Sequence, residues 1–169
     1  MAKPSIEEIA YHEAGHAVAF LRFGLRFDFV TIVPSAKHGC EGAVGHIGDD
    51  SLWIFHPSDL SRIEAMEDDI EKFKVIMSMG IALLAGLPGQ RLINANADAR
   101  GSRKDLAIAR SLLLSIRETD EKSDIEPFLE DLHLSAHNVI QANKATVCHL
   151  AEMLLEQKTM SYRKLRQAL

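Results

Sequence analysis

His12-Glu13-Ala14-Gly15-His16 is the stretch of sequence on which both the fold and the chemistry of this chain depend. In a helix, two histidines four residues apart lie one above the other on a single face, so both imidazoles can reach one metal ion. Zinc is the usual metal at this spacing. Glu13 points to a neighbouring face, close enough to hold a metal-bound water. The stretch therefore predicts a zinc site with an adjacent carboxylate.

A buried helix is predicted around this motif. Ser5 and Glu8 have the spacing of a capping box at its start, and Gly24 is suited to end the helix after Phe23. Ala17–Leu21 follow the motif with an unbroken apolar run, so the helix is apolar nearly all round. Imidazoles and a carboxylate on a buried helix need polar partners or a metal. This requirement favours a zinc site over a chance alignment of two histidines.

The composition indicates one ordinary globular domain. The chain has 169 residues, 47% of them hydrophobic, and a net charge of −5, which does not favour a nucleic-acid partner. The longest apolar run, Val75–Pro88, is too short to cross a membrane. Cys40 and Cys148 have no partner pattern, so we expect reduced thiols in a cytoplasmic protein with no membrane segment in this chain.

The predicted fold is mainly α (α+β): a helical bundle with a small β-sheet after the zinc-binding helix. Strands are predicted over residues 27–33, 42–47 and 51–55, which are rich in β-branched and aromatic residues or bounded by turn residues. Three histidines on strand ends or loops are expected to be structural or exposed rather than ligands: His38, His46 and His56. We expect one domain over residues 1–169, divided into a zinc-site core (1–118) and a C-terminal helical part (119–169).

Four further helical segments are predicted. Their ranges are 57–84, 106–117, 124–156 and 162–168. The acidic run Glu67–Glu71 is interpreted as the solvated face of the first, and Ser161 as the cap of the last after a break at Thr159. His133 and His137 repeat the four-residue spacing without a glutamate between them, which indicates an incidental pair.

Asp105 has two interpretations from spacing alone. It shares a helix face with Ala109 and Leu112, and a carboxylate at the edge of a buried apolar stripe requires a cation. Alternatively, Ser102-x-x-Asp105 is a capping box at the helix start, where the helix dipole favours a carboxylate. The spacing does not decide between them.

Nearly the whole chain resembles the zinc peptidase domain of FtsH-type membrane-anchored AAA proteases. The segments that carry the resemblance are His12–Val18, Val30–Pro34, Leu83–Gly86, Gly101–Leu106, Leu150–Glu156 and Tyr162–Leu165. The resemblance implies that Asp105 is the third zinc ligand, with Asp98 as the alternative. It also implies that a polypeptide substrate binds as an added strand, for which Val44, Gly45 and His46 are the candidate contacts.

The activity expected on these grounds is that of a zinc-dependent metalloendopeptidase. The zinc ion would lower the pKa of a bound water, and Glu13 would act as the general base while the hydroxide attacks a peptide carbonyl. Two departures from the family are evident. The chain has no P-loop string, so we expect unaided hydrolysis, a separate ATPase or adaptor partner, or a fragment of a larger protein. Gln90 replaces an acidic residue that supports the metal site in the family.

Two other functions remain open. One is a regulatory zinc protease of the ImmA/IrrE type, which the Asp105 segment and the C-terminal similarity do not favour. The other is a zinc-containing binding module without activity, against which the intact Glu13 argues, because a structural site has no use for a general base. Homo-oligomerisation is a further expectation, and the sequence does not indicate the symmetry of the assembly.

Overall fold

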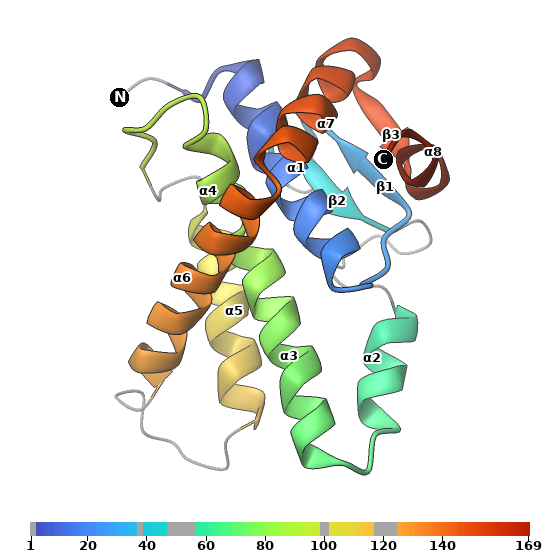
Figure 1. Cartoon of the computed structure of the whole chain (residues 1–169), viewed down its shortest axis with the longest axis vertical. Coiled ribbons are helices and arrows are strands. Elements are labelled where there is room, and N and C mark those ends of the chain that lie inside the picture. The colour runs from blue at the N-terminus through green and yellow to red at the C-terminus, as the bar shows by residue number, and fades with distance from the viewer. Residues whose placement is uncertain (1–2, 37–38, 47–56, 99–101, 117–124) are drawn as a thin grey trace.

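The computed structural model describes residues 3–36, 39–46, 57–98, 102–116 and 125–169, and it is mainly helical with one small antiparallel sheet (Figure 1), as the sequence predicted. In chain order the elements are α1 (Ile6–Arg22), β1 (Phe29–Thr31), β2 (Ala43–Gly45), α2 (Pro57–Glu64), α3 (Asp69–Leu84), α4 (Gly86–Gln90), α5 (Arg103–Ile116), α6 (Glu126–Ala142), α7 (Lys144–Gln157), β3 (Thr159–Ser161) and α8 (Tyr162–Ala168).

Helix α1, which carries His12 and His16, is buried from Glu13 to Phe20. Its capping box is formed as predicted: Glu8 N donates to Ser5 Oγ at 3.2 Å, and Ser5 N donates to Glu8 Oε2 at 2.8 Å. The chain leaves the helix through Gly24, whose φ of +66° suits glycine. Helices α3, α4 and α7 and the strands β1 and β2 all pack against α1 (Figure 1). The helix is therefore enclosed over most of its length.

The sheet has the strand order β2-β1-β3, and both pairings are antiparallel. The first two strands are shorter than the predicted ranges 27–33 and 42–47. The third predicted strand, 51–55, lies outside the described residues. The third strand of the sheet is β3, from a segment that was expected only to break a helix. Lys158, with φ of +64°, turns the chain after α7, and Ile32 N donates to Lys158 O at 2.9 Å.

The prediction of one long helix over 57–84 is wrong, because the segment divides into α2 and α3. The cause is Asp68, whose carboxylate accepts from Ile70 N at 2.8 Å and from Glu71 N at 3.2 Å and so caps a new helix. Ile70, in the first turn of α3, is 67% exposed. The second half of α3 is buried, including Met79 and Leu83.

The hydrophobic core lies between α1 and the helices that follow. Along α6 and α7 the buried residues are Leu129, Leu132, Ala136, Ile140, Val147, Leu150, Ala151 and Leu154. The two helices are separated at Asn143, whose side-chain amide donates to Val139 O at 2.8 Å. Within the described parts of the chain, no helix combines the length and the apolar character that a bilayer crossing requires.

Helix α4 lies unusually close to α1, because both helices carry glycine at the contact. A Cβ on Gly15 would stand 2.5 Å from Ala85 O, and a Cβ on Gly89 would overlap Tyr11 O. No side chain fits at either position without separating the two backbones. The close approach brings Gly86, at the start of α4, directly against the histidines of α1.

Candidate metal centre

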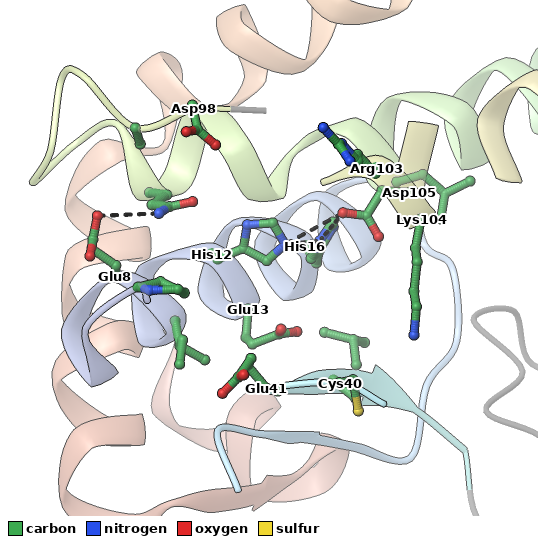
Figure 2. Close-up of a pocket in the computed structure, with 18 of the residues that line it drawn as sticks. Glu8, His12, Glu13, His16, Cys40, Glu41, Asp98, Arg103, Lys104 and Asp105 are labelled. Carbon is green, nitrogen blue, oxygen red and sulfur yellow. Dashed lines mark hydrogen bonds and ion pairs between the residues drawn. The ribbon is translucent and has the colours of Figure 1, made fainter. Parts of the chain in front are cut away.

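The structure brings His12, His16 and Asp105 together, although the aspartate lies on a different helix. The histidines belong to the middle of α1, and Asp105 belongs to the first turn of α5. His12 Nε2 and His16 Nε2 are 3.0 Å apart, and Asp105 Oδ2 lies 3.5 Å from the first and 3.6 Å from the second. Figure 2 shows the three side chains converging on one point in the cleft. Among the described residues, these three form the group whose possible ligand atoms all lie within 4.8 Å of one another, close enough to hold one metal ion.

These separations fit a zinc ion. Zinc–nitrogen and zinc–oxygen bonds of about 2.0–2.1 Å in a tetrahedral arrangement place neighbouring ligand atoms about 3.3–3.4 Å apart. The three observed separations, 3.0, 3.5 and 3.6 Å, lie on either side of that value. Asp105 Oδ2 is also buried with no hydrogen-bond partner in the described residues. A buried carboxylate oxygen in that position requires a cation, which is either a metal ion or a protonated imidazole.

A main-chain carbonyl orients His16 for metal binding. His16 Nδ1 lies 2.9 Å from Ala82 O, near the end of α3. Because a carbonyl only accepts hydrogen bonds, Nδ1 carries the hydrogen and donates it. In the neutral imidazole the lone pair then lies on Nε2, the atom that faces His12 and Asp105. Metal-binding histidines are commonly fixed by such a contact from their other ring nitrogen.

Gly86 forms one wall of the cluster and touches both imidazoles. A Cβ at this position would stand 2.5 Å from His12 Cε1 and 2.6 Å from His12 Nε2, and closer still to His16 Nε2. The rings of His12 and His16 lie edge to face, with centroids 4.7 Å apart. Any side chain at position 86 would therefore occupy space that the two rings need.

The charges of the cluster stabilise one another in the absence of metal. Burial is the largest single influence on His16 and lowers its pKa, but the carboxylates of Asp105 and Glu13 and the Ala82 carbonyl together outweigh it and raise that pKa to about 9. For Asp105 burial acts in the opposite direction, and the two imidazoles outweigh it and hold the pKa of the carboxyl well below its usual range. Without metal, the cluster is an imidazolium–carboxylate pair. A cation that binds here must displace the His16 proton.

Glu13 lies beside the cluster and is only 6% exposed. Burial raises the pKa of its carboxyl, and the nearby His12 and His16 partly offset the shift. Figure 2 shows the side chain pointing away from the imidazoles, toward the segment that carries Cys40 and Glu41. A carboxylate with a raised pKa next to a metal site is suited to accept and return a proton.

A cavity of about 970 Å³ opens onto the cluster. His12, Glu13, His16 and Asp105 all line it. Of the three residues predicted to contact a substrate strand, Val44 lines this cavity, whereas Gly45 is buried in β2 and His46 follows that strand. Strand β2 stands at one edge of the sheet, next to the cavity.

Several other sequence predictions concern residues near the cavity. Asp98, the alternative ligand, lines the cavity but is exposed and does not belong to the ligand cluster. The Ser102 side chain forms no cap, since its hydroxyl has no hydrogen-bond partner in the described residues. Gln90 donates to Glu8 Oε1 at 3.3 Å, alongside Asn94 at 2.6 Å, and so ties α4 to the start of α1.

The remaining histidine predictions concern residues away from the cluster. His133 and His137 are both exposed on α6, as expected of an incidental pair. His46 is partly buried and lies outside the ligand cluster. His38 and His56 lie outside the described residues.

Three supporting contacts were not predicted from the sequence: the Ala82 carbonyl, the bare Cα of Gly86 and the Glu8–Asn94 hydrogen bond. Each joins α1 to a segment more than sixty residues away. Among the sequence features, only the Gly-containing segment Leu83–Gly86 pointed toward any of them.

Comparisons of the sequence with models of known protein families and with curated proteins found no match. The resemblance to FtsH-type peptidase domains therefore stays a prediction. The function of the chain is argued below from the chemistry of the site itself.

Proposed function

We propose that this protein is a zinc-dependent metallopeptidase that hydrolyses peptide bonds in polypeptides. The observation that carries the proposal is the meeting of His12, His16 and Asp105 at the ligand separations of a tetrahedral zinc ion, with Glu13 beside them. Three protein ligands leave one position open, which distinguishes a catalytic zinc site from a structural one.

Each residue of the site has a distinct role in this proposal. His12, His16 and Asp105 hold the ion, and Ala82 O keeps His16 in the tautomer that presents Nε2. A zinc ion supplies a Lewis acid that activates water and polarises a carbonyl. Glu13 accepts the proton that water loses and delivers it to the departing amine. Burial raises the pKa of its carboxyl, which makes it a stronger base than an exposed glutamate.

The proposed substrate is an extended polypeptide that adds to the free edge of β2. That edge lies beside the cavity, and Val44 lines it. Main-chain hydrogen bonds to a strand edge bind many sequences alike, as a peptidase of broad specificity requires. We further propose that the protein is an FtsH-like endopeptidase of the cytoplasm, which acts alone or with a separate ATPase or adaptor.

The test uses the full chain and two assays. Bound zinc is measured by metal analysis, and cleavage is measured on casein and on a quenched fluorescent peptide, with and without ATP. Glu13→Gln should retain zinc and lose cleavage. Asp105→Ala should lose zinc, whereas Asp98→Ala, which removes a carboxylate from the same cavity, should keep both zinc and activity.

The other outcomes point to other functions. A wild-type chain that binds zinc but cleaves nothing under any condition is a binding module. Cleavage confined to one cellular protein indicates a regulatory protease. Zinc loss in Asp98→Ala together with zinc retention in Asp105→Ala would overturn the ligand assignment.

A further inference from the structure

The side chain of Glu13 packs against main chain beside the three clustered ligands. Glu13 is only 6% exposed, and it lines the cavity that opens onto the cluster. One close contact, on the side away from the imidazoles, limits where its carboxylate can lie.

That contact is made by Gly42, the buried residue immediately before β2. A Cβ at position 42 would stand 2.7 Å from Glu13 Cγ and 2.8 Å from Glu13 Oε1. It would also stand 2.9 Å from Thr31 O in β1, so the glycine cannot simply move away from Glu13. The Glu13 carboxylate therefore rests against the main chain at position 42. Any side chain at that position would push Glu13 and the strand apart.

The segment that carries Gly42 is itself tied to both sides of the cleft. Ser35 and Cys40 exchange backbone hydrogen bonds of 3.0 and 3.3 Å. Lys104 Nζ donates to Gly39 O at 2.8 Å, which joins the segment to the turn of α5 that holds Asp105. In Figure 2 the Lys104 side chain descends from α5 toward the strand segment of Cys40. The surface beneath Glu13 is thus fixed relative to a metal ligand.

We propose that Gly42 is a positioning residue for the general base: its bare Cα leaves room for the Glu13 carboxylate and fixes the carboxylate by contact. Its effect on turnover rests on the proposed peptidase function, whereas the contact itself does not. Gly42 lines the cavity but does not belong to the group of clustered ligands. Its influence on the reaction passes through Glu13 alone.

The first experiment measures zinc affinity, kcat and KM of the zinc-loaded full chain and its Gly42→Ala variant. A displacement of about 1 Å in a catalytic group costs about 100-fold in rate. We expect kcat to fall by about that factor, with KM and zinc affinity unchanged to within about twofold. Gly80→Ala is the matched control, because its Cβ would crowd Leu132 Cδ1 at 2.7 Å in the core, away from Glu13. It should leave kcat and zinc affinity unchanged.

A rescue experiment separates positioning from a general loss of structure. Glu13→Asp shortens the side chain by one methylene and withdraws it from position 42. Adding Gly42→Ala to Glu13→Asp should therefore cause no further fall in kcat. Losses that multiply in the double variant would show that Gly42 acts elsewhere, and a Gly42→Ala enzyme with the wild-type kcat would also overturn the proposal.

A measurement on the wild-type chain tests the contact without catalysis or substitution. Nuclear Overhauser effects between the Gly42 α-protons and the Glu13 γ-protons should be strong, and the side-chain couplings of Glu13 should report a single rotamer. Absence of these signals would refute the positioning role even if Gly42→Ala failed to fold. If the signals are present but no substrate is cleaved, the peptidase proposal fails and the packing of Glu13 stands.

Discussion

Gly86→Ala should remove zinc binding without unfolding the protein. The new Cβ would stand 2.6 Å from His12 Nε2, whereas ordinary contacts of this kind begin near 3.4 Å, so the ring would have to move by about 0.8 Å. A retreat of helix α4 would open its close glycine contacts with α1 at Gly15 and Gly89. Metal–ligand distances in zinc sites lie within about 0.2 Å of their typical values. We expect zinc affinity to fall by at least about 100-fold, or about 2.7 kcal/mol.

The assay is competition for zinc against a chromophoric chelator at fixed pH, combined with thermal unfolding of the metal-free chain. Alanine is the better helix former by up to about 1 kcal/mol, so any loss of metal-free stability should be small. Gly80→Ala crowds the core instead of the imidazoles and should bind zinc as the wild type does. Wild-type zinc affinity in Gly86→Ala would refute the reasoning, since it would mean that the rings do not depend on the space at position 86.

Three other predictions concern the metal-free cluster and the helix boundaries. Because zinc must displace the His16 proton and the pKa of His16 is raised to about 9, zinc affinity should rise about tenfold per pH unit from pH 6.5 to 9, and titration calorimetry should show the released proton. Because the pKa of His16 is raised in the folded state, its protonation stabilises the metal-free fold fully below the unfolded value of 6.5, and this stabilisation is lost as the pH rises through about 9. The melting temperature should therefore fall across that interval, an effect of up to about 3 kcal/mol in the free energy of unfolding that His16→Gln removes. Asp68→Ala should cost about 1 kcal/mol in urea unfolding because it removes the cap of α3, whereas Asp69→Ala, one residue on, should cost less; equal effects would count against the cap.

Helix α1 could be predicted closely because its signals are local. Ser5 and Glu8 mark its start, Gly24 follows its end, and the spacing of His12 and His16 places both on one face. Each of these depends only on residues within a turn or two along the chain. The mainly helical fold with a small sheet was predicted for the same reason.

Features that depend on distant segments could not be derived in this way. Spacing left Asp105 between a cap and a ligand, and the decisive fact is that the first turn of α5 lies over the histidine face of α1. Strand β3 has three residues, too few to show an alternating pattern, and its identity comes from pairing with β1. The division of 57–84 follows from a single side chain, Asp68, inside a run whose acidity suggested only solvent exposure.

The pairing of β1 with β3 also has a consequence for the order in which the protein is made. Thr31 Oγ1 and Thr159 Oγ1 lie 2.6 Å apart across that pair, although 128 positions separate them in the chain. Contacts between such distant segments form late and slow the folding of a domain. The histidines leave the ribosome first, but the central strand of the sheet acquires its second neighbour only after residues 159–161 have been synthesised. A growing chain thus carries the motif long before it carries the finished sheet.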